Sequence, residues 1–169
     1  MKTSFQIALL VVSVFLSSCL KTEDYPVEPQ ISFKNYLIGY TTDILGNSAK
    51  VVALTFSFSD GDGDIGLGDA DTIPPFDRGG KYYYNLVVTK FKKNNGIFTE
   101  VVENSDSIGY SYRIQPFPGV RNKKAIKGDI DVNINIYQST GKDTMKFKLF
   151  MYDRSLHKSN VITTPEITL

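Results

Sequence analysis

The sequence contains no tryptophan, one cysteine and one histidine among its 169 residues. A single cysteine can form no disulfide within the chain, so the hydrophobic core alone must stabilise the fold. One histidine and one cysteine also cannot supply the nitrogen and sulfur ligands of an ordinary zinc site. Phosphate-binding loops of the Walker or dinucleotide type are not found either, because Asp60, Asp62 and Asp64 interrupt the glycines that come nearest to one and would repel a phosphate.

The chain also lacks an excess of either charge. It has 19 Lys and Arg against 18 Asp and Glu, and Lys2 is the one charged residue before Cys19. A mature chain that begins at Cys19 is therefore formally neutral. Because nucleic-acid binding normally requires a basic surface, this balance predicts no nucleic-acid partner.

The N-terminus has the layout of a signal peptide. Lys2 is followed by an apolar run from Phe5 to Leu16 that Gln6 and Ser13 interrupt. The run is shorter than the ~20 apolar residues of a membrane-spanning helix, and no later stretch approaches that length. The pattern predicts export of the chain and removal of residues 1–18.

The end of this segment, Leu16, Ser17, Ser18 and Cys19, resembles the lipobox of bacterial lipoprotein signal peptides. The resemblance implies diacylglycerol on the Cys19 thiol, cleavage before Cys19, and attachment to a membrane through lipid. Two or three acyl chains hold firmly, since each buried methylene contributes about 0.8 kcal/mol. The alternative is an ordinary secretory signal in which Cys19 has no role.

Residues 19–30 form a predicted extended and flexible tether, because its prolines disfavour a helix in the residues before them. Within it, Lys21, Glu23 and Asp24 resemble the short acidic export signal of Bacteroidetes-type lipoproteins. That resemblance implies a place on the outer face of the outer membrane, with the periplasmic face as the alternative.

The remaining residues, 31–169, suffice for one domain, and their hydrophobic pattern has period two. In the clearest segment, 126–136, Ile and Val alternate with Asp and Asn. Two segments on either side of Asn94, Asn95 and Gly96 form a predicted hairpin. In chain order, strands are predicted at 31–40, 52–58, 82–91, 97–102, 107–114, 126–136, 145–151 and 161–169.

No segment shows a sustained apolar stripe at helical spacing. Seven or eight strands in one domain of this length predict an all-β fold, a single antiparallel β-sandwich, with a closed barrel as the alternative. Residues 152–160, YDRSLHKSN, resemble the last hairpin turn of bacterial immunoglobulin-like domains, and residues 58–66, FSDGDGDIG, resemble a segment of Bacteroidetes-type lipoproteins with such a fold. The resemblance implies an immunoglobulin-like sandwich and brings no established activity.

Carboxylates are concentrated after the predicted strand at 52–58. The candidate ligands are Asp60, Asp62, Asp64, Asp69 and Asp71, with a glycine between each of the first three. Carboxylates packed together repel unless water, a proton or a cation relieves them. Calcium takes six to eight oxygen ligands, and glycine lets the backbone wrap closely around an ion. The segment therefore predicts a calcium site, with a solvated turn that binds nothing as the alternative.

The pattern does not fit an EF-hand. Ile65 stands where such a loop has its glycine, Asp71 stands where it has Glu, and a strand precedes the segment. If the sandwich is immunoglobulin-like, 52–58 is its second strand and 145–152 its sixth, so the loops that follow them share one end of the domain. This registration predicts that Asp153 lies beside Asp60 and completes the ion shell.

Catalytic signatures are scarce. His157 is the one histidine, and residues of a single tight turn rarely form a catalytic triad, so we expect no enzymatic activity. We predict a lipid-anchored protein of the cell envelope or surface that serves adhesion or assembly with a protein or glycan partner; the sequence does not fix its oligomeric state. The alternative is a glycan-binding accessory protein of a polysaccharide-utilisation system. That role would need exposed aromatic faces among Tyr82, Tyr83, Tyr84, Tyr110, Tyr112 and Phe117.

Overall fold

The computed structural model describes residues 24–102, 110–117, 124–137 and 142–169. Cys19 and the predicted signal peptide lie outside the described residues. Within these ranges the chain is all-β, and no helix long and apolar enough to cross a membrane is found there. The strands are β1 Gln30–Thr42, β2 Ser48–Asp60, β3 Leu86–Asn94, β4 Ile97–Glu100, β5 Ile126–Ile136, β6 Thr144–Met151, β7 Ile162–Thr163 and β8 Ile167–Thr168.

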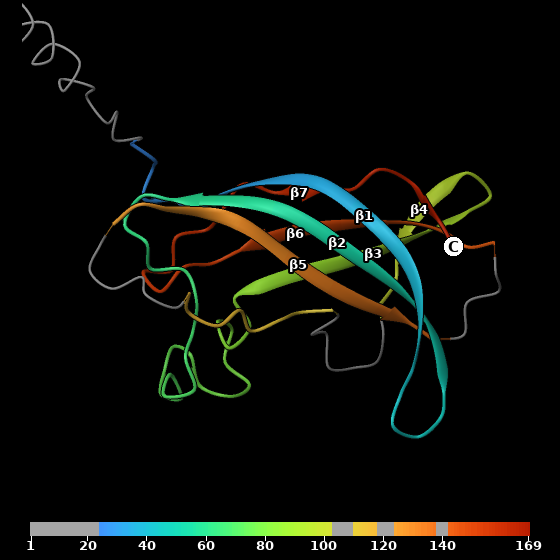
Figure 1. Cartoon of the computed structure of the whole chain (residues 1–169), viewed down its shortest axis with the longest axis horizontal. Coiled ribbons are helices and arrows are strands. Elements are labelled where there is room, and N and C mark those ends of the chain that lie inside the picture. The colour runs from blue at the N-terminus through green and yellow to red at the C-terminus, as the bar shows by residue number, and fades with distance from the viewer. Residues whose placement is uncertain (1–23, 103–109, 118–123, 138–141) are drawn as a thin grey trace, which may run out of the picture.

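The strands form two antiparallel sheets that lie one behind the other (Figure 1). The first sheet has the order β1-β2-β5, and the second has the order β4-β3-β6-β7, with β8 also paired to β6. Strand β2 thus lies between β1 and β5, and β3 lies beside β6, as in the strand order of immunoglobulin-like sandwiches. The predicted all-β antiparallel sandwich is confirmed.

The core lies between the two sheets because apolar residues alternate with polar ones along the central strands. In β5, the side chains of Ile130, Val132, Ile134 and Ile136 are at most 6% exposed, and the residues between them face away from the core. Strand β6 contributes Phe147, which is fully buried. These residues belong to one continuous hydrophobic cluster shared by both sheets.

The predicted hairpin is confirmed. Asn94 of β3 pairs with Ile97 of β4, and the two residues between them, Asn95 and Gly96, have φ angles of 49° and 82°. Positive φ at both central residues is the conformation of a type I′ turn, which joins twisted antiparallel strands.

Most predicted strands differ from those found at their ends, and three of the differences have a physical reason. Strand β3 begins at Leu86, later than predicted, because the side chain of the preceding Asn85 bonds both backbone groups of Ile114. Tyr112 pairs with Leu86 as an isolated bridge, so the described part of the segment 107–114 forms no strand. Pro165 separates β7 from β8, since proline cannot donate a ladder hydrogen bond.

Candidate metal centre

Four aspartates meet at the end of the sandwich where the second strand leaves the first sheet. Asp60 is the last residue of β2, Asp62 and Asp64 follow it, and Asp153 comes two residues after the end of β6. One carboxylate oxygen of each residue lies within 4.8 Å of the corresponding oxygens of the others. This group could hold a metal ion. The structure places Asp153 beside Asp60, as the predicted registration of strands requires.

Two glycines allow the loop to pack as it does. The Gly61 N–H donates to the Pro26 carbonyl at 2.8 Å, and a Cβ at Gly61 would stand 2.2 Å from the Tyr25 carbonyl oxygen. Gly63 has a φ of 70°, and a Cβ there would stand 2.1 Å from the Lys124 carbonyl oxygen. The Asp-rich loop therefore lies against the end of the predicted tether at Gly61 and against the residues before β5 at Gly63, and a side chain at either position would push the loop away.

Hydrogen bonds fix one oxygen of several of these carboxylates. Asp60 Oδ2 accepts from the Asp64 N–H at 2.9 Å, and Asp64 Oδ2 accepts from the N–H and the hydroxyl of Ser155 at 3.0 and 2.7 Å. The remaining oxygens, Oδ1 of Asp60, Asp62 and Asp64, are buried without a hydrogen-bond partner. Three unpartnered carboxylate oxygens in one place are the strongest sign of an occupant, since buried polar atoms are normally satisfied.

Asp153 is held from its own turn. Its two oxygens contact the N–H and the Nδ1 atom of His157, at 2.8 and 2.9 Å. The Asp153 side chain is 0% exposed and that of His157 is 37% exposed. His157 therefore orients a buried member of the group while its ring reaches solvent. The sequence offers one signal for this contact, since His157 stands four residues after Asp153 in the same turn.

Burial governs the protonation of the group. It raises the pKa of Asp60 from 3.8 to about 7, and the nearby negative charges of Asp62, Asp64 and Asp153 raise it as well. Burial also raises the pKa of Asp153, whereas hydrogen bonds from His157 lower it. The hydrogen bond to Asp153 raises the pKa of His157 in turn. The centre thus favours a proton or a cation over a set of bare charges.

The structure does not bring the predicted ligands Asp69 and Asp71 into this group. Asp69 is exposed to solvent. Asp71 forms a two-pronged ion pair with Arg154, in which Nη2 and Oδ1 are 2.8 Å apart, and it also accepts from the Gly68 N–H at 2.7 Å. This pairing lowers the pKa of Asp71, so the carboxylate is already neutralised by the guanidinium group.

The serines near His157 are engaged elsewhere. Ser155 Oγ donates to Asp64, and Ser159 Oγ donates to the Asn160 carbonyl at 2.7 Å. Neither hydroxyl is therefore placed by a hydrogen bond to His157, which a serine nucleophile would need.

Most aromatic residues proposed as a glycan platform are used in packing. Phe117 stacks on Phe58 with ring centroids 4.9 Å apart, and Tyr110 and Tyr112 pack against the core. Tyr83 and Tyr84 contact each other edge to face at 4.8 Å. These rings do not form one exposed row. Tyr82 differs, because its ring contacts Tyr152, which in turn contacts Phe150 of β6 in the second sheet.

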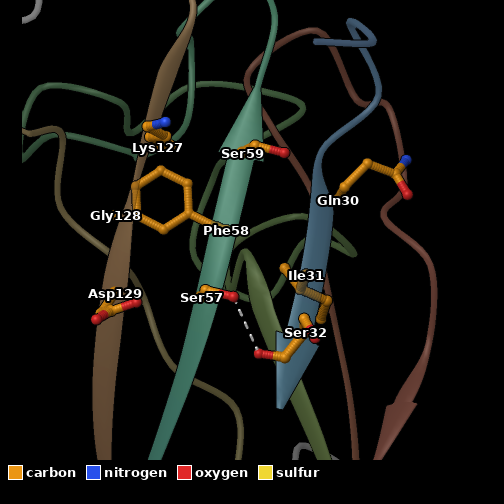
Figure 2. A pocket seen from close by; sticks show the side chains of 9 residues that line it. All are labelled: Gln30, Ile31, Ser32, Ser57, Phe58, Ser59, Lys127, Gly128 and Asp129. Carbon is orange, nitrogen blue, oxygen red and sulfur yellow. Dashed lines mark hydrogen bonds between the residues drawn. The ribbon is translucent and has the colours of Figure 1, made fainter. Parts of the chain in front are cut away.

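An open hollow of about 480 Å³ lies across the first sheet, near the start of β1 (Figure 2). Figure 2 shows the Phe58 ring beside Gly128 of β5, where a Cβ would stand 3.2 Å from that ring. The lining residues are Gln30, Ile31, Ser32, Ser57, Phe58, Ser59, Lys127, Gly128 and Asp129. The four clustered aspartates are not among them, so the hollow and the candidate metal centre are separate features.

Comparisons with family models, with curated proteins and with solved structures find no match to this chain. Sandwiches with the same strand order have many different functions, so the topology does not indicate the function of this chain. The features that bear on function are the carboxylate group and the surface of the sandwich.

Proposed function

We propose that this chain is a lipid-anchored β-sandwich of the cell envelope that binds calcium through Asp60, Asp62, Asp64 and Asp153. The observation that carries the proposal is Asp60, whose side chain is fully buried while its Oδ1 has no hydrogen-bond partner. Leaving one such atom unsatisfied costs about 1–3 kcal/mol, and more when it is charged. One cation would relieve all four carboxylates together.

The donor set and its spacing favour calcium. Carboxylate oxygens suit hard cations, and calcium binds them at about 2.3–2.6 Å, so two ligands on opposite sides of the ion stand about 4.6–5.2 Å apart. The four oxygens lie within 4.8 Å of one another. Magnesium demands near-octahedral geometry and usually keeps several waters, whereas calcium accepts a flexible shell of carboxylates and backbone oxygens. A loop that brings four carboxylates together therefore favours calcium.

The position of the centre supports a mechanical role. Asp60 ends a strand of the first sheet, Asp153 follows a strand of the second, and the adjoining Gly61 donates to Pro26 of the predicted tether. An ion bound here would stiffen the end of the sandwich from which the tether leaves. A domain held at a fixed angle on its anchor is suited to adhesion or assembly with a protein or glycan partner at the cell surface.

The anchor is the second part of the proposal, and the lipobox resemblance of residues 16–19 supports it. Mass spectrometry of the protein isolated from membranes tests it directly. We expect a chain that begins at Cys19 and carries lipid on its thiol. An intact residue 1, or an unmodified thiol at Cys19, would contradict the anchor and leave the calcium proposal standing.

Thermal unfolding of the full-length protein in detergent tests the calcium site. Because the chain has no tryptophan, far-UV circular dichroism is the suitable signal. A ligand at 100 times its dissociation constant adds about 2.7 kcal/mol to the folded state, so we expect millimolar calcium to raise the melting temperature by several degrees relative to EDTA.

Matched variants identify the ligands. Asp62→Asn and Asp64→Asn should lose most of the calcium-dependent rise in melting temperature. Asp69→Asn is the control, because it belongs to the same acidic segment but is exposed outside the group. An equal melting temperature of the wild type in calcium and in EDTA, or an equal loss in the Asp69 variant, would overturn the assignment.

A further inference from the structure

The outer face of the second sheet carries rings and ammonium groups side by side. In β6, Phe147 and Leu149 point into the core, so the alternate residues point outwards. The register brings outward residues of neighbouring strands together, since Phe91 pairs with Lys146 and Phe98 with Lys93. We define the basic–aromatic strip as Phe91, Lys93, Phe98, Lys146, Lys148, Phe150, Tyr152 and Lys158.

Each phenylalanine of this strip has an ammonium group over its face. Lys146 Nζ lies 4.4 Å from the Phe98 ring centroid, and Lys93 Nζ lies 5.4 Å from the same centroid. The corresponding distance is 4.8 Å for Lys148 and Phe91, and 4.0 Å for the Lys158 ammonium over Phe150. These contacts hold the lysines at the surface in a defined pattern instead of leaving them to extend freely into solvent.

The strip continues along β6 beyond the last lysine of the strand. The Phe150 and Tyr152 rings meet edge to face with centroids 5.6 Å apart, and Tyr152 meets Tyr82 at 5.0 Å. Lys81 lies over the Tyr82 ring at 4.8 Å. From Lys146 to Tyr152 the strand rises by roughly 20 Å, so the strip is long enough to contact several units of a polymer.

The charge of the strip is not balanced. Lys93 and Lys146 share Glu166, at 2.8 and 3.8 Å. Lys148 and Lys158 are exposed, and neither forms an ion pair among the described residues. The first sheet also exposes a lysine, but there Lys34 is paired with Asp129 at 2.7 Å. The second sheet therefore presents a positive face.

We propose that the basic–aromatic strip binds an acidic polysaccharide. Such a polymer combines pyranose faces, whose C–H groups stack on aromatic rings, with carboxylates that pair with ammonium groups. A sugar that stacks on Phe91 or Phe150 would displace the ammonium group above the ring. That group would then pair with the carboxylate of the same sugar, which the flexible four-carbon stem of lysine allows.

The chemistry of the strip favours this partner over other anions. Single-stranded nucleic acid would also stack and pair, but proteins that bind it present a much larger excess of basic charge. A lipid surface is met by apolar side chains that insert between the head groups, whereas the phenylalanine rings of the strip have ammonium groups over their faces. The inference does not depend on the calcium site, which uses different residues.

Isothermal titration of the full-length protein in detergent with tetragalacturonate tests the inference. The titration is made in EDTA, so that neither the sugar nor the aspartate group holds calcium. We expect saturable binding that weakens with added salt. The methyl ester of the same oligosaccharide, tetraglutamate and a thymidine tetranucleotide should each bind at least tenfold more weakly, because each lacks either the charge or the pyranose ring. Equal binding of tetraglutamate or of the tetranucleotide would overturn the assignment to a sugar.

Variants locate the site. The double substitution Lys148→Gln with Lys158→Gln removes two exposed charges and should weaken binding roughly tenfold, while the loss of two cation–π contacts should lower the melting temperature only slightly. The control is Lys34→Gln with Lys50→Gln on the first sheet, where Lys34 pairs with Asp129; it removes the same number of charges and should leave binding unchanged. Phe150→Leu tests the stacking contribution and should lower the affinity for the sugar while leaving the weak binding of tetraglutamate as it was. No measurable binding by the wild type, or an equal loss in the control, would overturn the proposal.

Discussion

The sharpest prediction concerns Asp60→Asn, whose effect on stability should change sign with calcium. Asparagine keeps an oxygen that can accept from the Asp64 N–H and replaces the unpartnered oxygen with an amide that can donate to its neighbours. In calcium-free buffer near pH 8, the variant should therefore be more stable than the wild type. With calcium, the order should reverse, because the variant has lost a charged ligand.

The size of the effect follows from the pKa of Asp60. In the unfolded chain Asp60 releases its proton near 3.8, whereas in the folded protein it keeps the proton until about pH 7. Between these values the folded state binds more protons, so rising pH lowers the free energy of unfolding. A rise from 3.8 to about 7 corresponds to roughly 4 kcal/mol, at about 1.4 kcal/mol for each pKa unit.

Urea unfolding followed by circular dichroism measures this effect. In calcium-free buffer, the stability of the variant minus that of the wild type should grow by roughly 4 kcal/mol from pH 4 to pH 8. The other carboxylates titrate in both proteins, so their contribution largely cancels in the difference. A difference that stays constant over this range would refute the reasoning about buried charge, and an equal gain from calcium in both proteins would remove Asp60 from the ligands.

The other predictions concern the packing that supports the site. Gly61→Ala should lower the free energy of unfolding by about 1–3 kcal/mol, because its Cβ would stand 2.2 Å from the Tyr25 carbonyl oxygen. Gly39→Ala in β1 should have little effect, since no atom lies within 4 Å of the added carbon; equal losses in urea unfolding would mean that residues 25–26 do not pack on the loop. Phe147→Ala should cost about 3–5 kcal/mol, because this ring is fully buried between the sheets, whereas Leu37→Ala, at a side chain that is 72% exposed, should stay within about 0.5 kcal/mol of the wild type. Similar melting temperatures for these last two variants would contradict the core described above.

Much of the fold could be predicted because alternation is a local property. The strand predicted at 126–136 is β5 without change, and the hairpin at Asn95 and Gly96 follows from the φ angles that these residues tolerate. Residues 82–85 were predicted to belong to a strand but lie before the start of β3. There the side chain of Asn85 bonds the backbone of Ile114, 29 positions away in sequence, and no local pattern predicts such a contact.

The candidate site could also be predicted only in part. Asp60, Asp62 and Asp64 are close together in sequence, and the assumed strand order of the sandwich predicted that Asp153 lies beside them. Asp71 was predicted as a ligand on its proximity in sequence, but its partner Arg154 is 83 positions away and removes it from the group. The basic–aromatic strip could be predicted only in part. Alternation puts Lys146, Lys148 and Phe150 on one face of their strand, but the pairing of β3 with β6, which sets Phe91 beside Lys146, has no local signal.

The position of the carboxylate group also bears on how this sandwich is held together without a disulfide. In antibody domains a disulfide joins the second and the sixth strand across the core, and a chain with one cysteine cannot form it. Asp60 ends β2, and Asp153 comes two residues after β6, so an ion held by both would link the same two strands at the end of the sandwich. Unlike a disulfide, such a link would depend on the calcium concentration around the protein. Because Gly61, beside Asp60, donates to the Pro26 carbonyl, loss of the ion should loosen both the contact between the two sheets and the junction with the predicted tether. Hydrogen exchange should therefore speed up at Gly61 and Asp64 on removal of calcium, while the centre of β5 stays protected.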